Sequence, residues 1–171
     1  MIYVLAVSVS MFSLLSCNGK EQQSAAGESN DANSEMQNEQ LFIQAMQNHL
    51  NAVSNRDLEI LESTMSPTGE MQLILPQTEI INNVEGFMDY HRQWFKDTTA
   101  WTFETKILNT KIGDKVGMAV TEVVYREPER NGQPYFNRMV VSYVLEKIDG
   151  EWYVIKDHAS TVEKSTDESR E

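Results

Sequence analysis

The stretch of sequence that decides the fold is DGEWYVIKDHAS, residues 149–160. It opens with Asp149-Gly150, a pair typical of the two-residue turn in a β-hairpin. Aromatic and β-branched residues follow, and these residue types favour strands. Another strand-forming run ends at Ile148, directly before the turn. The stretch therefore predicts an antiparallel hairpin whose second strand carries Asp157 and His158 near its end.

Three turns divide the C-terminal part of the chain into four predicted strands. Gly113-Asp114 predicts a second two-residue turn. Asn131-Gly132 stands between Pro128 and Pro134, and these prolines favour a longer loop. The prediction is an antiparallel meander with strands over Trp101–Asn109, Lys115–Arg126, Tyr135–Ile148 and Glu151–Ser160.

Helical patterns precede this meander. Apolar side chains at helical spacing predict a helix over Glu39–Asn55, with the inner face Phe42, Met46, His49, Leu50 and Val53. A short second helix follows a cap at Asn55 or Asp57, and a third helix starts after a cap at Asn82 or Asn83. Two short strand candidates, MQLILP and TEIIN, lie between these helices. This order predicts the α+β class, with helices packed on one face of an antiparallel sheet.

Pairing across the turns assigns side chains to the two faces of the sheet. If each turn holds two residues, Val141 faces both Glu122 and His158. Because side chains alternate along each strand, these pairs assign every other strand residue to one of the two faces. Most large apolar side chains then share one face: Trp101, Phe103, Ile107, Met118, Val120, Val124, Met139, Val141, Tyr143, Leu145, Trp152 and Val154. A polar row of Thr105, Glu122 and His158 joins them, while Asp157 points to the opposite face. Unpaired buried polar groups cost about 1–3 kcal/mol each, so this row either lines a cavity or is satisfied by hydrogen bonds.

The N-terminal segment predicts export. Residues 1–16 carry no charged side chain and are mostly apolar, as in a signal peptide. The segment ends in LLSC, which resembles a bacterial lipobox with Cys17, the sole cysteine, as the lipidated residue. The resemblance implies a lipoprotein anchored in the bacterial cell envelope and facing away from the cytoplasm. The alternative is an ordinary cleaved signal in which Cys17 is incidental.

Composition completes the domain plan. Residues 17–38 are rich in Ser, Asn, Gln and acids, which predicts a disordered tether, and residues 163–171 predict a disordered tail. The folded domain is then expected over residues 39–162. The formal net charge of −12 argues against nucleic acid as a partner, because phosphates require a Lys/Arg surface.

Two segments resemble a known family. AVSNRDLEILESTMSP, residues 52–67, is similar to the opening helices of nuclear transport factor 2-like proteins, especially their SnoaL-like (polyketide cyclase-like) branch. DGEWYVIKDHAS is similar to the last strand of that branch. The resemblance implies a cone-shaped fold, in which a curved sheet wraps around a pocket closed by the N-terminal helices and the third helix. Related folds include isomerases, cyclases, dehydratases and hydrolases, and also binding and dimerisation modules, so the fold alone does not decide function.

The candidate site residues follow from the registers and the resemblance. His158, with Glu122 beside it, is the candidate acid–base group, since its ordinary pKa suits proton transfer near neutrality. The candidate ligand-binding residues are His91, Trp94, Trp101, Thr105, Met118, Tyr143 and His158. No motif for a metal, a phosphate loop or a dinucleotide is present, so no metal or cofactor is expected.

Two classes of function remain open. The first is a binding module that holds a small, largely apolar molecule, or a dimeric interaction module that forms a homodimer. The alternative is an acid–base enzyme of the isomerase, cyclase or hydrolase type.

Overall fold

The computed structural model describes residues 21–77 and 79–165. The predicted signal peptide, residues 1–16, and Cys17 lie outside these ranges. The helices are α1 (Glu21–Asn55), α2 (Leu58–Ser63) and α3 (Val84–Phe95). The strands are β1 (Glu70–Ile74), β2 (Ile80–Asn83), β3 (Thr102–Ile112), β4 (Val116–Arg130), β5 (Gln133–Ile148) and β6 (Glu151–Lys164). Within the described ranges, no helix combines the length and apolar character that spanning a membrane requires.

Both ends of the domain carry more regular structure than we expected. α1 begins at Glu21, so residues 21–38 are helical where we predicted a disordered tether. Glu, Gln, Ala and Met in this segment are good helix formers, and a helix extends readily from an existing nucleus. Residues 21–35 belong to a unit of their own, and the compact domain begins at Met36. At the other end, β6 runs to Lys164, beyond the predicted boundary at residue 162.

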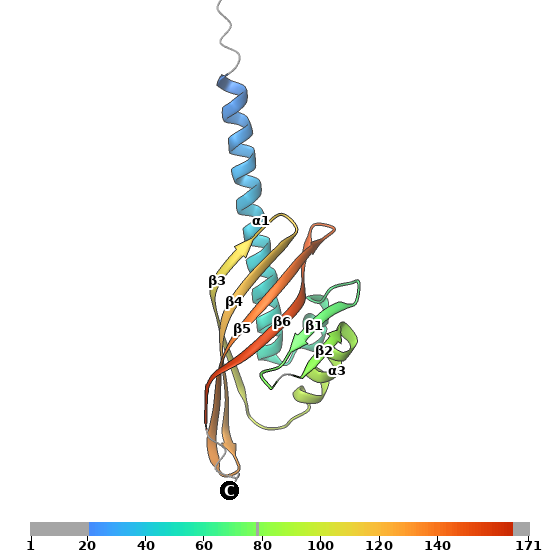
Figure 1. Cartoon of the computed structure of the whole chain (residues 1–171), viewed down its shortest axis with the longest axis vertical. Coiled ribbons are helices and arrows are strands. Elements are labelled where there is room, and N and C mark those ends of the chain that lie inside the picture. The colour runs from blue at the N-terminus through green and yellow to red at the C-terminus, as the bar shows by residue number, and fades with distance from the viewer. Residues whose placement is uncertain (1–20, 78, 166–171) are drawn as a thin grey trace, which may run out of the picture. The chain divides into compact units, whose positions relative to one another are not determined.

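Six strands form one sheet in the order β2-β1-β6-β5-β4-β3 (Figure 1). β3 to β6 form the predicted antiparallel meander. β1 pairs antiparallel with β2 but parallel with β6, because the meander leaves one edge of β6 free for it. We had predicted a wholly antiparallel sheet, but the pairing of β1 with β6 is parallel. The α+β class and the curved sheet around helices are confirmed.

The apolar face of α1 fills the inner side of the sheet. Its predicted inner residues Phe42, Met46, His49, Leu50 and Val53 are all buried. The Phe42 ring meets the Trp152 ring of β6 edge to face, with 5.2 Å between the ring centroids. Full burial of one such side chain stabilises the fold by about 1.5–3 kcal/mol. This face of α1 is therefore the main support of the curved sheet.

The predicted caps fix where the two shorter helices begin. The Asp57 carboxylate accepts a hydrogen bond of 3.0 Å from the backbone N–H of Ile60 at the start of α2. The Asn83 side chain accepts one of 2.7 Å from Gly86 at the start of α3. Each cap satisfies a backbone donor that the helix leaves free. α3 is thereby held beside β1 and β2 (Figure 1).

The turns follow their sequence signals only in part. Asp149-Gly150 is the predicted two-residue turn, with φ values of 51° and 93°. Asn131-Gly132 is also a tight turn, with φ values of 57° and 81°, so the predicted longer loop is wrong. Pro128 is tolerated because it falls in a register shift, where the ladder requires no N–H from it. At Gly113-Asp114 the prediction of a two-residue turn is also wrong, since Ile112 pairs with Gly117.

One-residue register shifts interrupt each of the three strand pairs of the meander. The extra residues are Leu108 in β3, one residue between Glu127 and Arg130 in β4, and Ile155 and Val162 in β6. Such bulges bend a strand and increase its twist, which suits a strongly curved sheet. Each bulge also moves the residues beyond it to the opposite face from that given by strict alternation.

These shifts correct our assignment of the faces. Between residues 118 and 124 of β4 the buried residues are Ala119, Thr121 and Val123, so the outward residues are those predicted to point inward: Met118, Val120, Glu122 and Val124. In β6 the register change at Ile155 buries Asp157 and exposes His158. The predicted polar row of Thr105, Glu122 and His158 does not form.

Gly117 tests the packing of α1 against β4. A Cβ at this position would lie 2.5 Å from Cε2 of Phe42. We expect Gly117→Ala to lower the free energy of unfolding by about 1–3 kcal/mol, because the buried ring has little room to move. Urea denaturation measures the difference. The neighbouring Val116→Thr is the control, since Val116 is 52% exposed and the change keeps a β-branched side chain. Equal stability of Gly117→Ala and the wild type would contradict this packing.

Candidate functional site

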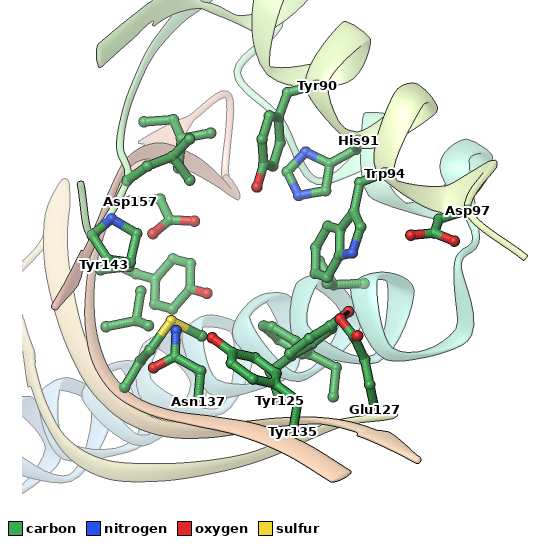
Figure 2. Close-up of a pocket in the computed structure, with 18 of the residues that line it drawn as sticks. Tyr90, His91, Trp94, Asp97, Tyr125, Glu127, Tyr135, Asn137, Tyr143 and Asp157 are labelled. Carbon is green, nitrogen blue, oxygen red and sulfur yellow. Dashed lines mark hydrogen bonds between the residues drawn. The ribbon is translucent and has the colours of Figure 1, made fainter. Parts of the chain in front are cut away.

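A cavity of about 330 Å³ lies between α3 and the inner face of the sheet (Figure 2). Its aliphatic lining comes from α1, from β1 and the residues after it, and from β5 and β6: Val53, Leu73, Leu75, Pro76, Met139, Val141 and Ala159. Its aromatic lining comes from α3 and the meander: Tyr90, Trp94, Phe103, Tyr125, Tyr135 and Tyr143. The volume and the apolar walls fall in the range of sites for small molecules.

Asp157 is the main ionisable group of this cavity. It lies on β6 between its register partners Tyr143 on β5 and Leu73 on β1, and its carboxylate points into the cavity (Figure 2). The residue is only 8% exposed, and its Oδ1 has no hydrogen-bond partner among the described residues. Burial raises its pKa from 3.8 to about 7. Asp157 therefore titrates near neutral pH inside the cavity.

Two tyrosine hydroxyls point into the same space as Asp157 (Figure 2). Tyr143 is buried, and its ring packs edge to face on that of His49, with centroids 5.5 Å apart. The pKa of Tyr143 is raised well above its ordinary value, mainly by burial and to a lesser extent by the charge of Asp157. The pKa of Tyr90 on α3 is raised by the same two causes and by Glu79. Both tyrosines therefore remain protonated and can donate a hydrogen bond to a group in the cavity.

His91 adds a neutral imidazole to the α3 side. Its Nδ1 lies 2.8 Å from the carbonyl oxygen of Phe87, which can only accept, so Nδ1 carries the proton. Nε2 is then a hydrogen-bond acceptor. Burial lowers the pKa of His91 to about 4, although the contact with Phe87 opposes this effect. The ring is therefore uncharged at neutral pH.

Trp94 forms one wall of the cavity, and Trp101 supports its ring from the side away from the cavity. Its ring stacks on that of Trp101 with centroids 4.7 Å apart. The Arg56 guanidinium covers the Trp101 ring at 3.9 Å and donates a hydrogen bond of 3.1 Å to the carbonyl oxygen of Trp101. Trp101 does not itself line the cavity. Trp101 instead positions Trp94 by stacking on it. The sequence had predicted that Trp101 contacts the ligand directly.

A charged network forms one side of the cavity. The Tyr125 hydroxyl donates a hydrogen bond of 2.6 Å to Glu127, and Arg130 pairs with the same carboxylate through Nε at 2.9 Å and through Nη2. The guanidinium also lies 3.5 Å from the centroid of the Tyr135 ring. Hydrogen bonds from Arg130 lower the pKa of Glu127 below its ordinary value, more than its burial raises it. Arg130 and Glu127 thus neutralise each other.

The cavity includes only part of the predicted site. His91, Trp94 and Tyr143 line it, as we expected. His158 and Met118 are exposed on the outer face, and the half-buried Glu122 contacts Arg138 at 3.4 Å. The prediction that His158, Glu122 and Met118 point into a pocket is therefore wrong, because of the register shifts.

Thr105 is half-buried but does not line the cavity. Sequence reasoning also missed several lining residues, above all Asp157, Tyr90 and Asn137. Tyr90 precedes His91 on the predicted third helix, so a wider inner face for that helix would have included it. Asp157 stands beside His158 in the family-like stretch DGEWYVIKDHAS, but strict alternation turned it outward and so excluded it from the predicted site.

The site offers no cluster of metal ligands within the described ranges. No three His, Cys, Asp or Glu side chains there come close enough to hold an ion. The polar groups that converge in the cavity are instead a carboxylate, two phenols, an imidazole and the Asn137 amide (Figure 2). These groups suit hydrogen bonding to one polar end of an otherwise apolar molecule.

The curved sheet, the covering helices and the internal pocket define an α+β domain with the nuclear transport factor 2-like fold. The chain belongs to the SnoaL-like domain family, which matches residues 43–163. Comparison with curated proteins gave no match.

Three solved structures illustrate the shared fold. A nuclear transport factor 2-like superfamily protein from Salmonella enterica is 14% identical, with a TM-score of 0.62, over 80% of this chain and 98% of that one. A hexachlorocyclohexane dehydrochlorinase is 14% identical, with a TM-score of 0.64, over 74% and 87%. The association domain of C. elegans CaMKII is 24% identical, with a TM-score of 0.58, over 75% and 98%. At these identities the likeness establishes the fold alone.

Asp157 predicts how stability depends on pH. Its pKa is raised on folding, so its ionisation opposes folding, and the free energy of unfolding should fall as the pH rises from about 4 to about 7. Each pKa unit corresponds to about 1.4 kcal/mol. We therefore expect Asp157→Asn to stabilise the protein by a few kcal/mol at about pH 8 and to change little near pH 4.

Thermal and urea unfolding at both pH values measure this difference. Asp114→Asn, in the exposed connection after β3, is the matched control and should change stability equally little at both values. A pH-independent effect of Asp157→Asn would contradict the buried, unpaired carboxyl group.

Proposed function

We propose that this domain binds a small, largely apolar molecule in the cavity, with one polar group of the ligand directed at Asp157. The observation that carries the proposal is a space of about 330 Å³ lined mainly by aromatic and aliphatic side chains, with a buried carboxyl group that lacks a hydrogen-bond partner on one oxygen. Leaving such a group unsatisfied costs about 1–3 kcal/mol. A ligand that supplies the missing hydrogen bond would recover part of that cost.

Filling the cavity tests the proposal directly. Val141 lines the cavity, whereas its neighbour Val140 lies on the outer face. We expect Val141→Trp to weaken binding of the neutral fluorescent probe N-phenyl-1-naphthylamine at least tenfold, because the indole occupies the space of the ligand. Val140→Trp should leave binding unchanged.

Circular dichroism shows whether each variant is folded. If Val141→Trp does not fold, Ala159→Leu provides a smaller change on the same wall. Equal probe binding by the wild type and a folded, cavity-filled variant would rule out the cavity as the binding site. Native mass spectrometry of the purified domain would then identify any ligand that it retains.

The second candidate is acid–base catalysis, in which Asp157 takes the role that we first assigned to His158. A carboxylate with a pKa of about 7 is suited to accept a proton near neutrality. It would remove a proton from the carbon beside a carbonyl group. The electron pair of that C–H bond would form a C=C bond to the carbonyl carbon, and the π pair of the carbonyl group would move to its oxygen. The hydroxyls of Tyr143 and Tyr90 would stabilise the resulting oxyanion. One structural neighbour is named as a dehydrochlorinase, and so as an enzyme.

Hydrogen–deuterium exchange of 2-tetralone tests this chemistry without knowledge of the natural substrate. If Asp157 acts as a base, the protein should accelerate exchange at the carbon beside the carbonyl, and the rate should rise with pH through about 7. Asp157→Asn should reduce the acceleration at least a hundredfold. His158→Ala, on the outer face of the same strand, should not alter it. Exchange at the buffer rate in the wild type would leave only the binding function.

An interaction module is the weaker of the two binding possibilities. The outer face of β4 does expose apolar side chains: Val116 is 52% exposed and Met118 42%. One structural neighbour is an association domain. A homodimer through this face would nevertheless leave the cavity and Asp157 without a role. Ligand binding accounts for both.

We further propose that the domain is tethered to the bacterial cell envelope, outside the cytoplasm, by a lipid on Cys17. The supporting feature is the lipobox-like LLSC after an uncharged apolar run. We expect cells that express the full chain to incorporate radiolabelled palmitate into the protein and Cys17→Ser to lose the label. Asp157→Asn should keep it. Absence of label in the wild type would contradict the anchor and favour a cleaved signal.

A further inference from the structure

The side chains around the cavity carry an excess of negative charge. Three acids line it, Asp97, Glu127 and Asp157, against a single arginine, Arg130. Arg130 is bound to Glu127, and the pKa of His91 is too low for a charge at neutral pH. Among the described residues, Asp157 has no salt-bridge partner within 4 Å. An ionised Asp157 is thus a buried charge without a counter-ion in the protein.

Aromatic rings supply the rest of the wall. Tyr90, Trp94, Phe103, Tyr125, Tyr135 and Tyr143 all line the cavity. The face of an aromatic ring attracts a cation within about 6 Å, by about 0.5–2 kcal/mol. Two rings of this region already accept cations from the protein itself: Tyr135 from Arg130 at 3.5 Å, and Trp101 from Arg56 at 3.9 Å.

We propose that the ligand is a small organic cation, an apolar body with one protonated or quaternary amine that lies against the Asp157 carboxylate and the neighbouring tyrosine rings. This inference rests on the proposed binding function and specifies the chemical class of the ligand. A buried carboxylate becomes favourable when an opposite charge is brought to it, whereas an anionic ligand would meet the like charge of Asp157. A neutral ligand would leave the ionised Asp157 uncompensated.

The inference requires binding to depend on the ionisation of Asp157. The groups that face it are Tyr143 on β5 and Tyr90 and His91 on α3, with Glu79 close to Tyr90 and the apolar Leu73 on β1. Both tyrosines and His91 stay neutral around pH 7, so Asp157 is the group that titrates there. A cation should bind more tightly as the pH rises through about 7, and a neutral molecule should not.

Three probes distinguish charge from shape. Benzyltrimethylammonium carries a permanent positive charge and does not titrate, and 2-methyl-1-phenyl-2-propanol is a neutral molecule of nearly the same size. The anion 3-phenylpropionate completes the series. Calorimetry of the full folded domain at about pH 8 should give at least tenfold tighter binding of the cation than of the alcohol, and no binding of the anion. At about pH 5.5 the affinity for the cation should fall about tenfold.

Substitutions then assign the effect to Asp157. Asp157→Asn should remove the preference for the cation and its pH dependence, yet keep binding of the alcohol. Asp114→Asn should leave all affinities unchanged, since this exposed residue lies outside the cavity.

The outcomes separate this inference from the proposed function. Equal or tighter binding of the alcohol at pH 8 would overturn the cation and leave the cavity as a binding site. Failure of the cation to bind at pH 8 would also overturn it, whatever the other probes do. In that case binding of N-phenyl-1-naphthylamine decides whether the proposed function survives.

Discussion

A single extra residue in β6 determines the chemistry of the cavity. Val154 and Lys156 pair with consecutive residues of β5, so Ile155 is accommodated as a bulge. Beyond it, Asp157 turns inward to a space lined by rings and aliphatic side chains, and His158 turns to the exterior. The raised pKa of Asp157, its unpaired oxygen and its closeness to two phenols all depend on this local geometry. The functional proposals depend on it equally.

Much of the fold could be predicted from local sequence signals. The helical spacing of Phe42 to Val53 gave the buried face of α1, and single side chains, Asp57 and Asn83, capped α2 and α3. The pair Asp149-Gly150 gave a tight turn because both positions need a positive φ. Such signals act over a few residues, where the chemistry of each side chain is decisive. Family resemblance supplied the long-range arrangement.

The candidate site was predicted less well, because it depends on register. A turn sets the pairing only up to the next bulge, and the residues at these bulges, such as Leu108 and Ile155, have no distinctive composition. Residues on the helix, His91 and Trp94, were placed correctly since α3 has no such interruption. Residues on strands were placed correctly only in part: Tyr143 was right, but Glu122 and His158 were assigned to the wrong face. The information that was missing is the curvature of the sheet, which arises from packing around α1.

The stacked pair of Trp94 and Trp101 has a consequence for observing the protein. The two indole rings lie with centroids 4.7 Å apart and an angle of 17° between their planes, close enough for their electronic transitions to couple. Trp94 lines the cavity, whereas the third tryptophan, Trp152, packs on Phe42 in the core. The domain therefore carries an intrinsic optical reporter: a molecule that enters the cavity changes the surroundings of one coupled chromophore and leaves the distant one as an internal reference.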